Sequence, residues 1–170
     1  MVTIETERLT LVACPAQVAR AAYQGRRHAE ALLGVRLHDQ WPGEDIRAFL
    51  PIYAQQLEYD ATLLGWGIWL MVERADRVVI GDVGFKGKPG GRGIVDLGYG
   101  VVPAYRQQGY AYEAARAMRD WAFADAAVQR VTADCLPDNF ASARILEKLG
   151  MRRTGTSESG LLTWEIARPT

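Results

Sequence analysis

Two kinds of hydrophobic pattern alternate along the chain and predict its helices and strands. Residues 16–34 place alanines and leucines at helical spacing, and Gly34 is expected to end this helix. A second helix is predicted from about Glu44 to Tyr59. From Gly65 onward the pattern is rich in β-branched and aromatic residues, in the segments WGIWLMVER, RVVIGDVGF and GIVDLGYGVV. We expect these to be consecutive antiparallel strands.

The second half returns to helical spacing and then to strands. Residues 111–126 place one apolar face of Ala111, Ala114, Ala115, Met118, Trp121 and Ala122 against the predicted sheet. RLTLVA near the start, RVTADCLP, MRRTGTSES and GLLTWEIAR are predicted strands, and DNFASARILEKLG is a predicted short helix. This order of elements is typical of an α+β or mixed α/β fold.

Composition limits the class of protein. With 170 residues and 49% hydrophobic residues, the chain is expected to form one domain over residues 1–170. Twenty basic and twenty acidic residues give no net field to attract nucleic acid or an anionic membrane. The two cysteines, Cys14 and Cys135, cannot build a disulfide framework, and the start MVTIETERLT is unlike a signal peptide. We therefore expect a soluble, cytoplasmic protein.

The segment AYRQQGYAYEA, residues 104–114, lies between a predicted strand and a predicted helix. A helix start exposes unpaired N–H groups and the positive end of the helix dipole, and together these can bind an anion. The alternative is an ordinary turn in which Gly109 only relieves backbone strain.

Two common nucleotide patterns do not fit this segment. No Gly-Lys-Ser/Thr follows for a triphosphate, and Arg106 stands where a dinucleotide fingerprint needs its first glycine. What remains is a pyrophosphate held without metal by the backbone amides of residues 108–112. Neither His28 nor His38 joins a cysteine in a recognisable motif, so no metal site or thiol nucleophile is expected.

Three segments resemble a known family. The pattern Arg106-x-x-Gly109-x-Ala111, preceded by DLGYGVVPAY, resembles the coenzyme A pyrophosphate loop of the GNAT superfamily of N-acetyltransferases. LPDNFASARILEKLGM, residues 136–151, is similar to the segment of that family that flanks the pantetheine arm. The head, ETERLTL, is similar to the start of the Rim-type enzymes, which acetylate N-terminal amines of ribosomal proteins.

The resemblance implies a mostly antiparallel twisted sheet of six to seven strands flanked by about four helices, with splayed strands forming an acetyl-CoA cleft. It also implies direct transfer of acetyl from acetyl-CoA to an amine. A strand bulge at Val101 or Val102 would open backbone N–H groups toward the thioester. The expected cofactor contacts are Val101, Val102, Arg106, Gln107, Gln108, Gly109, Tyr110, Ala111, Tyr112 and Asn139.

The sequence departs from the family pattern at one catalytic position. Many members protonate the departing thiolate with a tyrosine, but that position is Leu146 here, and Ser142 is the nearest hydroxyl. Asp96 is the candidate for the proton-accepting side. Alternation places it on one strand face with Gly98 and Gly100, where there is room for a ligand. The alternative is an exposed aspartate on a sheet face.

Other residues leave two interpretations open. Asn139 could cap its helix, but Asp138 could do so equally well and leave Asn139 to bind the pantetheine amide. Glu113 lies in the first helical turn, where the dipole stabilises a carboxylate anyway. Trp41 lies in the loop that in the family helps to wall the acceptor cleft, so it is a candidate substrate contact. The other tryptophans at strand or helix positions are expected in the core: Trp66, Trp69, Trp121 and Trp164.

The predicted function is therefore an acetyl-CoA-dependent N-acetyltransferase of the Rim-type branch, a monomer or homodimer, acting on a protein N-terminal amine. A small-molecule amine such as an aminoglycoside is the alternative acceptor. A binding module that retains acyl-CoA but has lost turnover is the alternative outside enzymes.

Overall fold

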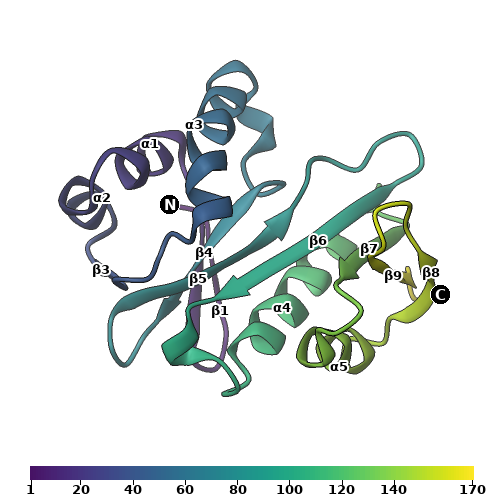
Figure 1. Cartoon of the computed structure of the whole chain (residues 1–170). Helices are drawn as coiled ribbons and strands as arrows, with labels where there is room; N and C mark the ends of the chain where they lie inside the picture. Colours follow the sequence, from purple (N-terminus) through teal and green to yellow (C-terminus); the bar gives the residue numbers. More distant parts are fainter.

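Nine strands form one open, twisted sheet in the computed structural model, which describes all 170 residues (Figure 1). The sheet order is β1-β2-β4-β5-β6-β7-β9-β8, and β3 pairs with β5. Only the β6/β7 and β3/β5 pairs are parallel. The strands are β1 (Thr3–Glu5), β2 (Leu9–Ala13), β3 (Arg36–Leu37), β4 (Ile68–Glu73), β5 (Val78–Phe85), β6 (Ile94–Val101), β7 (Arg130–Cys135), β8 (Arg152–Thr156) and β9 (Leu162–Ala167).

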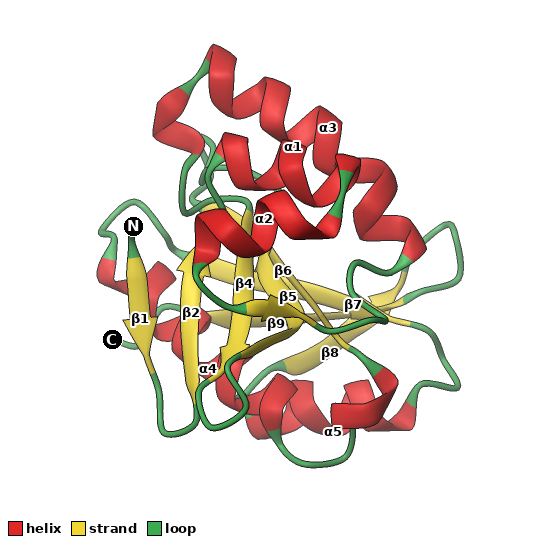
Figure 2. Cartoon of the chain, turned by 90° about the vertical axis from the view of Figure 1, so that its left-hand side faces the viewer, coloured by secondary structure: helices red, strands yellow, loops and turns green.

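Helices cover both faces of this sheet (Figures 1 and 2). On one face lie α1 (Ala16–Gln24), α2 (Arg26–Leu33) and α3 (Glu44–Tyr59), and on the other lie α4 (Tyr110–Ala124) and α5 (Phe140–Lys148). Single 3₁₀ turns span Ala61–Leu63 and Pro103–Tyr105. No helix combines the length and the apolar character needed to cross a membrane.

The mostly antiparallel α+β architecture is confirmed, with more elements than the six to seven strands and four helices expected. The helix predicted over residues 16–34 divides at Gly25, whose backbone is extended. Glycine has a low helix propensity, and the helix is interrupted there. The helical spacing of the apolar residues continues across Gly25 and therefore did not reveal the interruption. The strands β1 and β3 have three and two residues, too few to show an alternating pattern.

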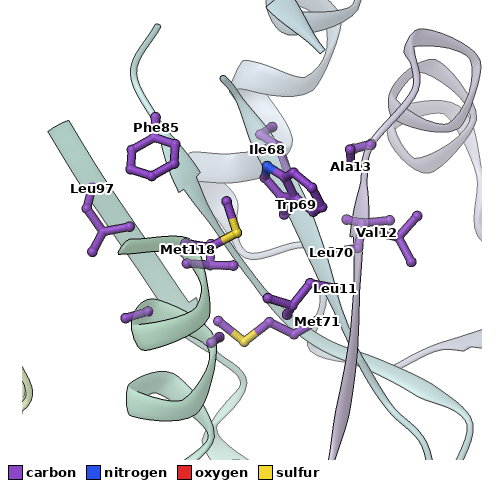
Figure 3. Packing of buried hydrophobic residues seen from close by; sticks show 14 of the residues in the cluster. Leu11, Val12, Ala13, Ile68, Trp69, Leu70, Met71, Phe85, Leu97 and Met118 are labelled. Carbon is purple, nitrogen blue, oxygen red and sulfur yellow. The ribbon is translucent and has the colours of Figure 1, made fainter. Parts of the chain in front are cut away.

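The apolar face predicted for residues 111–126 packs on the sheet as α4. Met118 lies among Leu11, Met71 and Leu97 from three strands, as the close view in Figure 3 shows. Ala114, Ala115, Met118 and Ala122 have no exposed surface. Trp69 and Trp164 are buried as expected, while Trp66 and Trp121 are partly buried and pack against the core. Trp121 stacks with Phe85, and Trp66 contacts the same ring in a tilted arrangement.

The pairing of β6 with β7 is short. It joins Ile94, Val95 and Asp96 to residues 130–132 and ends there, although β6 continues to Val101. Beyond Asp96 the two strands diverge, and the chain leaves β7 toward α5, which lies on the same face of the sheet as α4. The splayed strands implied by the family resemblance are therefore β6 and β7.

The bulge expected at Val101 or Val102 is not present. The β5/β6 register runs without interruption from Leu97 opposite Phe85 to Val101 opposite Gly81. The irregularity lies instead between β4 and β5, where Met71 pairs with Gly81 and Val72 with Val79, so that Ile80 is the extra residue. The Val102 N–H donates to the Ile80 carbonyl at 2.8 Å, which removes it as a free donor.

We expect Gly84→Ala to lower the free energy of unfolding by about 3 kcal/mol, because a Cβ there would overlap with the carbonyl of Gly67, the residue just before β4. Its cross-strand partner Gly98 provides the control, since a Cβ at that position meets no atom within 4 Å. Gly98→Ala should therefore stay within about 0.5 kcal/mol of the wild type in urea denaturation. Equal losses in the two variants would contradict this packing.

Candidate functional site

A run of backbone donors begins α4. The N–H groups of residues 107–112 donate to no acceptor within the chain, whereas the Glu113 N–H already bonds the Gly109 carbonyl in the first helical turn. Unpaired donors of this kind, at the positive end of a helix dipole, bind phosphate oxygens well. The anion site predicted from AYRQQGYAYEA therefore has the donors that it needs.

The conformation of this loop keeps its amides on one surface. Gln107 (φ 59°) and Gly109 (φ 85°) both adopt left-handed conformations around Gln108, and alternating backbone conformations of this kind form anion-binding concavities. The longer side chains bond back to the backbone: Arg106 Nε donates to the Val101 carbonyl at 2.8 Å, and Gln108 Nε2 to the Ala104 carbonyl at 3.2 Å. Arg106 and Gln108 thus stabilise the loop, and its ligand donors are main-chain groups.

A cavity of about 890 Å³ lies beside β6, between β5 and the loop that leads into α3. Gly98 and Gly100 line it, as alternation along β6 predicted, and so do Val101, Val102 and Arg106. Trp41, Phe49, Ile68 and Val83 supply apolar wall. A cavity of this size with a few polar groups is typical of a small-molecule site.

Asp82 lies in this cavity and was missed by the sequence analysis. It is on β5, directly opposite Gly100, and its Oδ2 accepts a hydrogen bond from Trp41 Nε1 at 2.9 Å. Burial raises the pKa of Asp82 to about 6, because desolvation disfavours the carboxylate more than the indole hydrogen bond favours it. The sequence did contain an indication of this position: in RVVIGDVGF, Asp82 lies two residues before Gly84, so the aspartate and that glycine share one face of the strand.

Trp41 therefore differs in detail from its prediction. It lines the cavity, but only 2% of its surface is exposed, and its polar atom is used by Asp82. Its indole holds the carboxylate in place and closes one wall.

Asp96 does not reach the cavity. Its Oδ2 forms an ion pair with Lys86 Nζ at 2.8 Å, and its Oδ1 accepts from Thr132 Oγ1 at 2.9 Å. Lys86 lines the cavity and Asp96 does not. The face predicted for Asp96 is correct, but the side chain lies where β6 still pairs with β7 and has its own partners.

Asn139, and not Asp138, caps α5. Its Oδ1 accepts from the Ser142 N–H at 3.1 Å, so the expectation that Asp138 would cap the helix and leave Asn139 free is wrong. The cap uses only the carbonyl oxygen of Asn139, whereas the amide nitrogen is its donor group. A contact from that nitrogen to pantetheine stays a prediction.

Ser142 has a partner that the sequence did not indicate. The Tyr99 hydroxyl, from β6, lies 2.8 Å from Ser142 Oγ on α5 and so bridges the gap where β6 and β7 diverge. Burial is the main cause that raises the pKa of Tyr99, so this phenol stays protonated at neutral pH. Leu146, at the position of the family's tyrosine, is completely buried in the core.

The donor loop, residues 104–112, follows directly on β6, and the cavity lies beside both, lined by Val101 and Arg106. Similarity to known proteins identifies the family to which this arrangement belongs. Residues 8–152 match the family model for the acetyltransferase (GNAT) domain. The chain belongs to the GNAT acetyltransferase family. It is similar to the uncharacterized N-acetyltransferase YjdG of Bacillus subtilis (strain 168), with 32% identity over 150 residues, which is 88% of this chain and 89% of that protein.

Solved structures show the same GNAT fold. The ribosomal-protein-S5-alanine acetyltransferase from Vibrio fischeri has a TM-score of 0.69 at 17% identity, covering 99% of this chain and 97% of that one. Mycobacterium smegmatis RimJ in complex with CoA-disulfide has a TM-score of 0.68 at 19% identity, covering 98% of this chain and 87% of that one.

As a GNAT N-acetyltransferase, this enzyme uses acetyl-CoA as its acetyl donor. The unpartnered amides of residues 107–112 fit a pyrophosphate, and the cavity extends to the same loop, where Pro103 and Arg106 line it.

The raised pKa of Asp82 predicts that Asp82→Asn stabilises the fold. The carboxyl is ordinarily half-ionised near pH 3.8 and in the fold near pH 6, so its ionisation lowers stability as pH rises between these values. Above about pH 6 the whole penalty applies, and removing it should add about 2–3 kcal/mol. The asparagine oxygen can still accept from Trp41. Thermal melts at pH 4 and pH 7.5 test this, and a variant less stable than the wild type at pH 7.5 would contradict it.

Proposed function

We propose that this enzyme acetylates the N-terminal amine of a protein, with Asp82 as the group that binds the amine and accepts its proton. The observation that carries the proposal is the half-buried carboxylate of Asp82 opposite Gly100, lining an open cavity beside Trp41, Ile68 and Val83. An N-terminal residue presents one ammonium group on a short, compact body. The family likeness to solved ribosomal-protein acetyltransferases supports this acceptor class.

Asp82 has the properties that the proton-accepting side needs. With a pKa near 6, it is ionised at neutral pH and can pair with an incoming ammonium. The Trp41 indole bonds one carboxylate oxygen and leaves the other for the acceptor. The proton passes to the carboxylate, and the freed nitrogen pair attacks the thioester carbon of acetyl-CoA.

The N–H of Val101 is our candidate donor to the thioester oxygen. The N–H groups of antiparallel strands alternate in direction, and the Val102 N–H points to β5. The Val101 N–H therefore points away from β5, into the gap that β7 leaves after Asp96. A donor there stabilises the negative charge that develops on the oxygen.

The Tyr99 and Ser142 hydroxyls are the proposed proton source for the departing thiolate. As the new C–N bond forms and the C–S bond breaks, Ser142 donates its proton to sulfur while the Tyr99 hydroxyl, 2.8 Å away, donates a hydrogen bond to Ser142 Oγ. A proton from solvent then restores the serine hydroxyl, so that Ser142 and Tyr99 are both neutral when coenzyme A leaves. This pair takes the proton-donating role of the tyrosine that many family members have at the position of Leu146.

A polycationic small molecule is the second acceptor class, and one observation favours it. Glu44 and Asp45, in the first turn of α3, also line the cavity. Together with Asp82 they could hold a ligand with several amines, such as an aminoglycoside.

A mass-spectrometric screen with acetyl-CoA separates these acceptors. Peptides with free N-termini should gain one acetyl group at the α-amine, while matched N-terminally blocked peptides with internal lysines should gain none. Modification of aminoglycosides alone would overturn the N-terminal proposal. Failure of every amine to release free thiol, with coenzyme A still bound, would favour a module that has lost turnover.

The role of Asp82 predicts a pH dependence. The kcat/KM for the acceptor should fall as pH decreases below about 6, where the carboxyl becomes protonated. Asp82→Asn should lower kcat by about 100-fold and remove this acid limb, while the KM for acetyl-CoA stays unchanged. A larger loss in Asp96→Asn than in Asp82→Asn would transfer the role to Asp96.

A further inference from the structure

The turn between β1 and β2 contacts the donor loop, although the two lie about a hundred residues apart in sequence. This turn carries Thr6 and Arg8 of the ETERLTL segment, and Figure 1 shows it beside the start of α4. Glu113, in the first turn of α4, accepts from the Thr6 hydroxyl and from the Arg8 N–H, each at 2.6 Å. The carboxylate of Glu113 is therefore bound by specific partners in this turn, in addition to its favourable interaction with the helix dipole.

The Arg8 side chain reaches further into the loop. Its Nε donates to Glu113 Oε2 at 2.8 Å, and a second guanidinium nitrogen donates to the Gln108 carbonyl at 2.8 Å. Its central carbon lies 4.0 Å from the centre of the Tyr110 ring. A Cβ at Gly109 would lie 3.2 Å from the remaining nitrogen. One side chain thus contacts Gln108 in the loop and Tyr110 and Glu113 in the first turn of α4, and it occupies the space beside Gly109.

The bond to the Gln108 carbonyl determines where the next amide points. In a trans peptide the C=O and the following N–H point in opposite directions. With the Gln108 carbonyl directed at Arg8, the Gly109 N–H is directed away from it, on the ligand side. A hydrogen bond at the carbonyl also polarises the amide and strengthens its N–H as a donor.

The charge of Arg8 is matched by Glu113, only 14% of whose side chain is exposed. The turn that carries Arg8 is itself fixed, since Arg74 donates to the Thr6 carbonyl at 2.6 Å and Thr6 bonds Leu9 across the turn. Arg8 therefore extends from a rigid base, and its contacts are with the loop backbone and α4.

We propose that Arg8, held by Glu113, is a positioning residue that orients the amides of residues 107–112 for the pyrophosphate of acetyl-CoA. This rests on the proposed use of that loop for coenzyme A. The pair acts through the loop and does not touch the reacting atoms. Lysine cannot replace Arg8, because a point charge cannot bond Glu113 and the Gln108 carbonyl in the same fixed geometry.

The test compares two acetyl donors. Arg8→Gln should weaken acetyl-CoA, with KM and calorimetric Kd about 10-fold higher and kcat at saturation within about twofold of the wild type. With acetylpantetheine, which lacks the pyrophosphate, kcat/KM should not change. Arg8→Lys should resemble Arg8→Gln, and Glu113→Gln combined with Arg8→Gln should add little to either single change.

Arg20→Gln is the matched control, because Arg20 forms a comparable two-bond pair with Glu58 on the exposed surface of α1 and α3. It should leave both donors unaffected. An equal loss with acetyl-CoA and acetylpantetheine in Arg8→Gln, or unchanged coenzyme A affinity in both Arg8 variants, would overturn the inference. Absence of coenzyme A binding to the wild type would instead contradict the use of the loop itself.

Discussion

The parallel pairing of β6 with β7 stops at Asp96, and the site depends on this early end. Past that residue, one edge of β6 has no neighbouring strand, so its N–H and C=O groups face a gap. Unpaired backbone groups inside a fold cost free energy unless water or a ligand satisfies them. Candidate groups lie on both faces of the sheet beside this edge. Asp82 and the glycines lie toward one face, and Tyr99 reaches Ser142 toward the other.

A second constraint is the desolvation of Asp82. A carboxylate on an inner strand with one hydrogen-bond partner destabilises the fold at neutral pH, and that same desolvation moves its pKa into the range useful for accepting a proton. Asp96 shows the contrast within one sheet, since an ion pair with Lys86 and a hydrogen bond from Thr132 satisfy its carboxylate. Two aspartates on adjacent strands thus differ in how fully their partners satisfy the carboxylate.

What the sequence could predict depended on how local the cause is. The face shared by Asp96, Gly98 and Gly100 follows from the two-residue period of a strand, and the apolar face of α4 follows from helical spacing. The donor loop could be predicted for the same reason, because it is one continuous segment between a strand and a helix.

Contacts between distant segments could not be predicted in this way. The environment of Asp82 depends on Trp41 and on the pairing of three strands, and the contact of Arg8 with Glu113 joins residues 105 positions apart. The wrong prediction of a bulge at Val101 or Val102 has the same origin. The extra residue, Ile80, is defined by how β5 pairs with β4, and the segment GYGVV does not indicate it.

The glycines of β5 and β6 differ in what surrounds them. Gly81 and Gly84 on β5 are pressed against backbone from adjacent strands, whereas Gly98 and Gly100 on β6 face open space in the cavity. Side chains can therefore appear on β6 without disturbing the sheet, and each would change the shape offered to an acceptor. Over evolutionary time, acceptor preference in this scaffold can diverge through β6 while β5 stays constrained by the fold.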